Sequence, residues 1–75
     1  MKISLKAARS NKNFTQKQAA ILIGVSEDTI SNWERGKSYP NALAIKKIEE
    51  VYQVRYDDVI FLTPKDALSV NRNER

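Results

Sequence analysis

The clearest pattern of apolar and polar positions lies between residues 15 and 37, where apolar residues recur at helical spacing. Thr15 and Gln18 fit the reciprocal capping pattern that begins a helix, in which each side chain satisfies an unpaired backbone N–H. Gly24 follows the apolar run, at a point where a left-handed residue commonly ends a helix. The apolar positions that share the helical spacing are Ala19, Leu22 and Ile23. A short helix is therefore predicted over about residues 16–23.

A second helix is predicted directly after the first, between Ser26 and Gly36. Ser26 is a favourable N-cap, and Gly36 is a residue that ends a helix in the left-handed conformation. Ile30 and Trp33 lie three residues apart and share a face, which favours the core side for the tryptophan. At about 100° per residue, the opposite face carries Asp28, Ser31, Asn32 and Arg35. Two helices joined by a tight turn, with a polar face of this kind, are suited to the major groove of DNA.

Three further helices are predicted around this pair, which makes the expected fold all-α with five helices. The first begins near Ile3 and ends between residues 11 and 13. The next follows a loop over residues 37–41, and Asn41 is its expected N-cap. Its apolar positions follow the i, i+3, i+7 pattern of an amphipathic helix, and they are Ile45, Ile48 and Tyr52. A last short helix is expected over residues 54–62.

The C-terminal part of the chain divides at about residue 62. Residues 1–62 are predicted to form one domain, and the polar stretch over residues 63–75 is predicted to be a frayed tail. Val59 to Leu62 supply more apolar surface than one small core needs, which indicates a contact with a second copy of the chain.

Composition narrows the classes of function. The chain of 75 residues contains neither Cys nor His, so disulfides, thiolate chemistry and the usual zinc sites are excluded, and no metal or cofactor is predicted. Its formal net charge of +4 favours a polyanionic partner. No apolar run approaches the roughly 20 residues of a membrane span, and no signal-peptide core is present. We therefore expect a cytoplasmic protein without a membrane partner or a small-molecule ligand.

Phe14 directly precedes the Thr15 cap, and we expect its ring to pack beside that cap.

An enzyme is disfavoured by the same composition. A general acid–base site has little to be built from without histidine, cysteine or a carboxylate pair in a pocket, so no catalytic residue is predicted. Asp57 and Asp58 are adjacent acidic residues, but neighbours on a helix point about 100° apart.

The chain resembles the helix-turn-helix proteins of the Cro and phage-repressor class, also called the XRE family, over roughly residues 3 to 62. The matching residues are Arg9, Thr15-Gln16, Ala19-Ala20, Gly24-Val25-Ser26, Thr29-Ile30, Trp33-Glu34-Arg35-Gly36-Lys37, Pro40 and Tyr56-Asp57-Asp58-Val59. The resemblance implies a compact lambda-repressor-like domain. It also implies a sequence-specific transcriptional regulator of double-stranded DNA, with a small phage- or plasmid-type repressor as the first expectation.

The resemblance assigns expected roles to residues of the two central helices. Phosphate contacts or flanking positions are expected at Gln16, Lys17, Ser26, Ser31, Arg35 and Lys37. Base reading is expected at Glu27, Asp28, Thr29 and Asn32. An asparagine can pair with adenine through two hydrogen bonds, and a threonine methyl can touch the methyl of thymine. In addition, the resemblance implies an ion pair between Arg9 and Glu34 that ties the first helix to the recognition helix.

Two acidic residues at the start of the recognition helix depart from many relatives. Glu27 and Asp28 either accept hydrogen bonds from cytosine N4 or only favour the positive end of the helix dipole and exclude wrong sites. Arg55 also departs from the Ser or Thr cap that many relatives place there, so the start of the last helix stays open.

The size of a single module favours a homodimer on a palindrome, with half-sites roughly 34 Å apart or a multiple of that distance. The alternative function is a protein-interaction module on the same fold, since fold does not fix function. An antitoxin or a restriction–modification controller shares the architecture as well. Salt dependence separates DNA binding from a protein partner, because binding to phosphates weakens steeply with salt.

Overall fold

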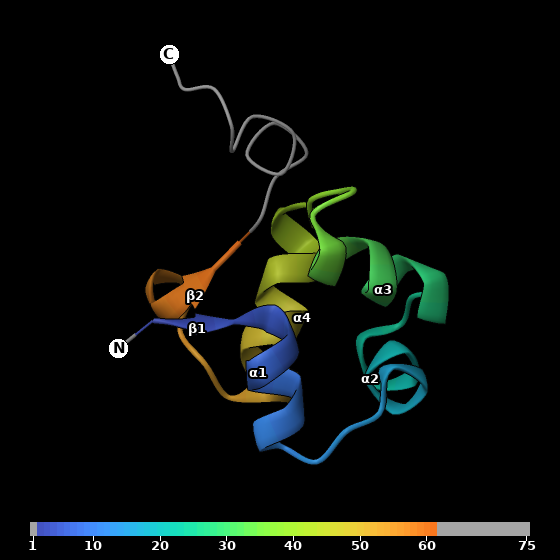
Figure 1. Ribbon diagram of the computed structural model, residues 1–75, viewed down its shortest axis with the longest axis horizontal. Helices are drawn as coiled ribbons and strands as arrows, with labels where there is room; N and C mark the ends of the chain where they lie inside the picture. Colours follow the sequence, from blue (N-terminus) through green and yellow to red (C-terminus); the bar gives the residue numbers. More distant parts are fainter. Residues whose placement is uncertain (1, 62–75) are drawn as a thin grey trace.

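The computed structural model describes residues 2–61, and these residues form a small bundle of helices closed by two short strands (Figure 1). The elements in chain order are β1 (Ile3–Ser4), α1 (Leu5–Asn11), α2 (Gln16–Ile23), α3 (Glu27–Arg35), α4 (Ala42–Tyr52), a 3-10 helix η1 (Tyr56–Asp58) and β2 (Val59–Ile60). The predicted tail, residues 63–75, lies outside the described residues, as does Leu62.

Each of the four α-helices begins at the kind of residue that satisfies its free N–H groups. The side chains of Ser4, Thr15, Ser26 and Asn41 each accept a hydrogen bond from the backbone N–H three residues later. At Thr15 the predicted capping box is complete, because the Gln18 side chain also accepts from the Thr15 N–H at 2.9 Å. Local sequence therefore sets the starts of α1 to α4.

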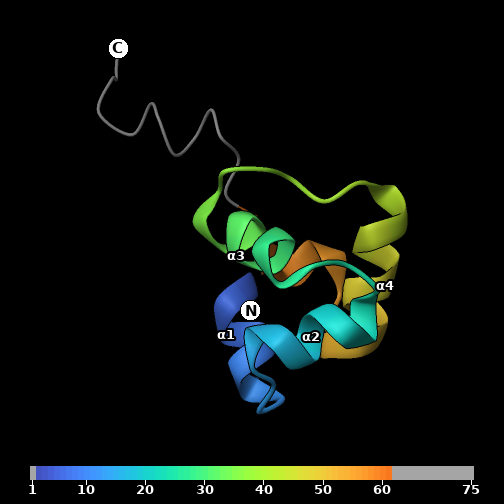
Figure 2. The same ribbon diagram turned by 90° about the vertical axis from the view of Figure 1, so that its right-hand side faces the viewer.

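Two glycines end the central helices in the left-handed conformation, as predicted. Gly24 has φ +92° and Gly36 has φ +77°, values that residues with a Cβ seldom adopt. Gly24 turns the chain from α2 into α3, and the second view displays this turn with α2 below and α3 above it (Figure 2). The two glycines thereby fix the lengths of the two helices.

The core lies where α1, α2, α3 and α4 meet, and it is built mainly of aliphatic residues with one tryptophan and one tyrosine. Ile30 and Ile48 are each 1% exposed and form its centre, while Trp33 is 7% exposed. The other buried apolar residues are Leu5, Ala8, Ala19, Ala20, Ile23, Tyr52 and Val59. The predicted inward position of Ile30 and Trp33 is confirmed, and it turns the opposite face of α3 outward.

The two ends of the described chain differ from the prediction. The sequence predicts a helix that begins near Ile3, but Ile3–Ser4 form a strand and α1 begins at Leu5, because Ser4 caps the helix instead. The last helix expected over residues 54–62 is wrong in the described part, where one turn of 3-10 helix precedes the strand Val59–Ile60. Residues 2–61 therefore contain four α-helices, whereas the sequence predicts five.

The strand pairing explains this difference. Ile3 pairs with Val59 and Ser4 with Ile60 in a parallel arrangement, so each end of the domain is tied to the other. Val59 and Ile60 are β-branched residues, which favour an extended conformation when a partner strand is present.

In the part of the chain that the structure covers, no helix is long and apolar enough to cross a lipid bilayer.

Candidate nucleic-acid interface

The outer face of α3 is polar and accessible. Asp28 and Arg35 are exposed on this face, whereas Ser31 and Asn32 are half-buried. Glu27 is exposed at the first position of the helix. Every group on this face can donate or accept a hydrogen bond, which is what reading base edges in a major groove requires.

Thr29 lies on the flank of α3 rather than at the centre of its outer face. Its hydroxyl is 2.8 Å from the Ser26 hydroxyl, and its backbone N–H donates to Ser26 Oγ at 3.1 Å. Together with Trp33 it lines a groove of about 370 Å³ against the start of α4, where Leu43 and Lys47 form the other wall. Ser26 therefore both caps α3 and orients Thr29.

The side chains of Asn32 and Arg35 are joined on the outer face. The Nη2 group of Arg35 donates a hydrogen bond to Asn32 Oδ1 at 3.2 Å. The backbone carbonyl of Asn32 in turn accepts from the N–H of Lys37 at 2.8 Å, within the left-handed turn at Gly36. The turn that ends α3 thus fixes the main chain from which the Asn32 side chain projects.

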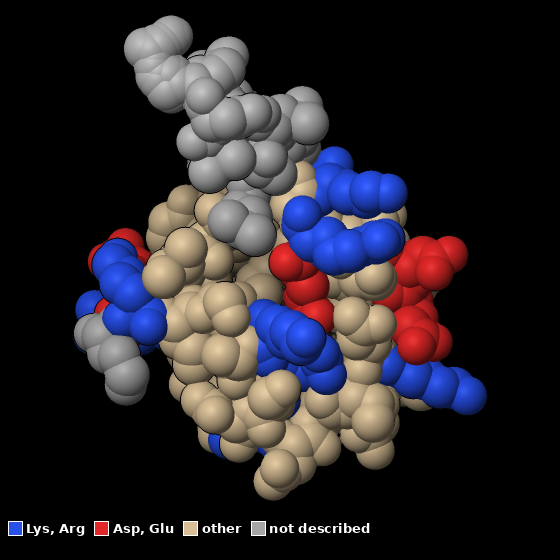
Figure 3. Space-filling model, viewed as in Figure 1, with Lys and Arg blue, Asp and Glu red and all other residues tan. Residues whose placement is uncertain are grey.

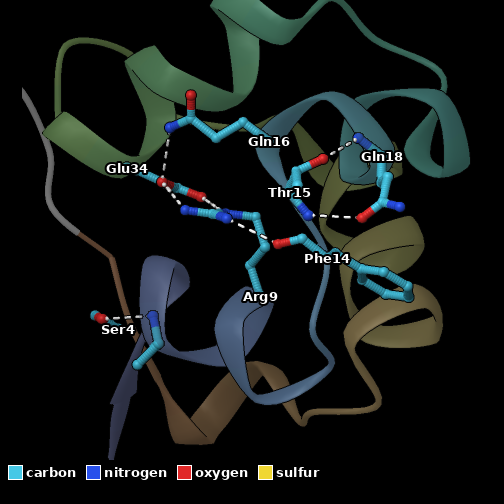
Figure 4. Close-up of polar contacts among 8 residues, drawn as sticks. Ser4, Arg9, Phe14, Thr15, Gln16, Gln18 and Glu34 are labelled. Atoms are coloured by element: carbon cyan, nitrogen blue, oxygen red, sulfur yellow. Dashed lines mark hydrogen bonds and ion pairs between the residues drawn. The ribbon is translucent and has the colours of Figure 1, made fainter.

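A buried ion pair joins α1 to α3, as the resemblance implied. Arg9 Nε donates to Glu34 Oε2 at 2.6 Å, and Arg9 Nη2 donates to Glu34 Oε1 at 3.1 Å, a two-point contact (Figure 4). The side chains are only 11% and 5% exposed, respectively. Geometry of this kind is the strongest that an arginine and a carboxylate form.

The same pair also fixes the start of α2. Arg9 Nη1 donates to the carbonyl of Phe14 at 2.8 Å, and Gln16 Nε2 donates to Glu34 Oε1 at 3.0 Å (Figure 4). Glu34 thus accepts three hydrogen bonds from two different elements. The hydrogen bonds that Arg9 donates to Glu34 raise the pKa of Arg9, and burial opposes that rise only in part. The orientation of α2 relative to α3 therefore rests on this network, named here the Glu34 network and made of Arg9, Phe14, Gln16 and Glu34.

Tyr52 packs in the core close to the charges of this network. Burial, followed by the negative charge of Glu34, raises the pKa of Tyr52 from 10.0 to about 12, while Arg9 acts in the opposite direction. A pKa raised in the folded state contributes stability that is complete below pH 10 and is lost as the pH rises through about 12.

We expect a Tyr52→Phe variant to reveal this loss. Between pH 9 and 12 the free energy of unfolding of the unsubstituted protein should fall by about 2 to 3 kcal/mol relative to the variant, because each pKa unit is worth about 1.4 kcal/mol. Urea unfolding at several pH values measures both proteins. If the two stability curves run parallel over this interval, the phenol does not titrate as described.

Positive and negative side chains lie next to one another around the predicted interface. Lys17 on α2 and Lys37 after α3 are exposed, as are Glu27 and Asp28 at the start of α3. The space-filling view shows blue and red side chains intermingled over the side of the molecule that carries α3 (Figure 3). The basic residues are suited to phosphates, whereas the acidic pair restricts which part of α3 can approach a strand closely.

Several side-chain contacts in this region do not follow from the sequence, and two of them show why. The bond from Gln16 to Glu34 joins residues 18 positions apart, and the bond from Arg35 to Asn32 depends on the rotamers of two side chains on the outer face of α3. Only the second has a sequence signal, since residues three apart on a helix are neighbours.

Comparison with known proteins agrees with this geometry. The chain matches the helix-turn-helix family over residues 5–59. It is 41% identical over 56 residues to the HTH-type transcriptional activator BcrR of Enterococcus faecalis, covering 75% of this chain and 28% of that protein. It is 34% identical over 70 residues to the HTH-type transcriptional regulator ImmR of Bacillus subtilis (strain 168), covering 93% of this chain and 52% of that protein.

A third relative is closer in length. An uncharacterized HTH-type transcriptional regulator of Archaeoglobus fulgidus is 29% identical over 66 residues, which cover 88% of this chain and 93% of that protein. The chain spans only about a quarter and about half of the two bacterial relatives. The match and the relatives agree on a helix-turn-helix over residues 5–59. The chain belongs to the XRE-type helix-turn-helix family of DNA-binding transcriptional regulators.

Proposed function

We propose that this protein binds a palindromic operator as a two-fold dimer and represses the promoter that the operator overlaps, as a small phage- or plasmid-type repressor does. The observation that carries the proposal is the orientation of α3. Ile30 and Trp33 hold one face of the helix in the core, so the polar face that bears Asp28, Asn32 and Arg35 is accessible to a duplex. In this proposal α3 lies in the major groove and the N-terminus of α2 meets the backbone.

Phosphate contacts set the position of the domain in this arrangement. Lys17 precedes α3 in the sequence and Lys37 follows it. Both are exposed cations, and each can neutralise a phosphate. Gln16 and Ser26 stand at the starts of α2 and α3, where the positive end of the helix dipole favours an anion. The Glu34 network supports this role, because it holds Gln16 beside α3.

Base reading is assigned to the residues on and beside the outer face of α3. Asn32, Ser31 and Arg35 occupy the last turns of the helix, while the two carboxylates stand at its start. We assign Glu27 and Asp28 to acceptance from cytosine N4, which is the only donor that cytosine presents in the major groove. Thr29 reaches the duplex from the flank of α3, and its hydroxyl is within hydrogen-bond distance of the Ser26 hydroxyl.

The dimer contact is assigned to the end of the described chain. Ile60 is 49% exposed, and the ring of Phe61 lies 5.2 Å from that of Tyr39 and 5.4 Å from that of Tyr56, measured between centroids. Tyr39 and Tyr56 are themselves 40% and 45% exposed. This accessible aromatic cluster supports a contact with a second copy, because one module alone buries little surface on DNA.

Selection of bound sites from random double-stranded DNA tests the proposal. We expect an enriched palindrome whose half-sites are separated by about 34 Å or a multiple of it, and sedimentation on that DNA should give two chains per site. A reporter with the selected site inside its promoter should lose expression. A monomer both free and bound would reject the dimer, and increased expression would reject repression.

A second candidate function is favoured by the acidic start of α3. Two carboxylates are repelled by phosphates, so a protein partner with a basic surface is the alternative ligand for this face. Retention on DNA distinguishes the two functions. Binding to DNA should weaken steeply between about 50 and 200 mM salt. If the protein is not retained on DNA even at low salt, the result favours the protein partner.

A further inference from the structure

The hydrogen bond between Arg35 and Asn32 decides what the recognition helix can offer to a base. We propose that Arg35 occupies the amide oxygen of Asn32 and thereby makes Asn32 a donor, so that this position reads guanine and not adenine. The inference rests on the proposed function, since it names the base that α3 selects. Arg35 acts as a positioning residue here, because it works through the Asn32 amide.

The first step concerns the atoms that an asparagine uses on adenine. A bidentate contact needs the amide oxygen to accept from N6 while the amide nitrogen donates to N7. In this protein Asn32 Oδ1 already accepts from Arg35 Nη2 at 3.2 Å. That bond takes one of the two lone pairs of the oxygen, and the positive guanidinium beside it disfavours the approach of a second donor such as the N6 amino group.

The second step concerns the groups that remain. Asn32 Nδ2 keeps its N–H donors, and a guanidinium carries five N–H groups, of which one is used in this bond. Arg35 is exposed, so its other N–H groups are accessible. The pair therefore presents mainly donors. Guanine is the base that presents two acceptors, N7 and O6, side by side in the major groove.

The third step concerns how firmly the pair is held. Asn32 is half-buried, and its carbonyl accepts from the N–H groups of Lys37 at 2.8 Å and Ser38 at 3.4 Å. The main chain beneath the amide is thus fixed by the left-handed turn at Gly36. Arg35 and Asn32 lie three residues apart, where helix side chains meet without a change in backbone.

Selection of bound sites by four proteins tests the inference. Asn32→Ala identifies the base position that Asn32 reads, since preference is lost there. The unsubstituted protein should prefer guanine at that position, and Arg35→Met should shift the preference toward adenine by about tenfold, the size of one good bidentate contact. Lys37→Met is the matched control: it removes a nearby positive charge that is not bonded to the Asn32 side chain, so it should weaken all sites and keep guanine.

Thermal unfolding of each variant confirms that it is folded, which is expected because all three positions lie outside the buried core. Adenine at the Asn32 position in sites selected by the unsubstituted protein would overturn this inference and leave the proposed function standing. So would an unchanged guanine preference in Arg35→Met. If the unsubstituted protein selects no sequence, the proposed function fails, and this inference fails with it.

Discussion

Replacing Glu34 by glutamine should lower the thermal unfolding midpoint by roughly 10 to 20 °C, the shift that a loss of about 3 kcal/mol produces in a domain of this size. The substitution keeps the shape of the side chain but leaves Arg9 charged and buried without its carboxylate, since the Glu34 side chain is 5% and the Arg9 side chain 11% exposed. A buried charge that loses its partner costs far more than an exposed ion pair gives. The bond from Gln16 is weakened as well, so α2 loses one of its ties to α3.

The matched control is Glu50→Gln, which removes a carboxylate from the exposed side of α4. Its unfolding free energy should change by no more than about 0.5 kcal/mol. Calorimetry or circular dichroism measures both variants under one buffer condition. An unchanged midpoint for Glu34→Gln would mean that the Glu34 network does not hold the two central helices together.

Asn32→Ala should lose base preference by about one to two orders of magnitude at one position of the site, while most of the non-specific affinity remains. The reason is that Asn32 lies on the outer face of α3 and carries no charge that a phosphate would attract. Lys37→Ala should behave in the opposite way, because Lys37 is an exposed cation beyond the end of the helix. It should weaken binding to all sequences and reduce the slope of log affinity against log salt by about 1.

Fluorescence anisotropy on a selected duplex and on a scrambled duplex, at several salt concentrations, gives both quantities. Ser10→Ala serves as a control, since Ser10 is exposed on α1. It should leave preference and slope unchanged. If Asn32→Ala and Lys37→Ala change binding in the same way, the division between base reading and phosphate contact is wrong.

The central part of the fold is predictable from sequence because its determinants are local. Thr15, Ser26 and Asn41 cap helices within three residues of themselves, and Gly24 and Gly36 end helices through their own backbone conformation. The inward positions of Ile30 and Trp33 follow from helical spacing alone.

The ends of the domain depend on contacts that sequence pattern does not reveal. The pairing of Ile3 with Val59 joins residues 56 positions apart, and neither strand is long enough to show alternation. Gln53 adopts φ +55° at the end of α4 and redirects the chain, although glutamine is a good helix former. Tertiary pairing therefore overrides local preference over residues 54–60.

The interface was predictable in its outline and less so in its contacts. The polar face of α3 follows from helical geometry, and the pair of Arg9 with Glu34 followed from resemblance to the family. The hydrogen bonds of the individual side chains could not be predicted. Thr29 is bonded to Ser26 and Asn32 to Arg35 through rotamers that no spacing rule fixes. These bonds decide which atoms are free to meet a base.

The most direct measurement of the central claim is a nuclear magnetic resonance titration of the labelled protein with its selected duplex. If α3 enters the major groove with its polar face, the largest shifts should occur at Asp28, Ser31 and Asn32, and the indole N–H of buried Trp33 should move little. Shifts concentrated on α4, with the outer face of α3 unchanged, would contradict this mode of binding.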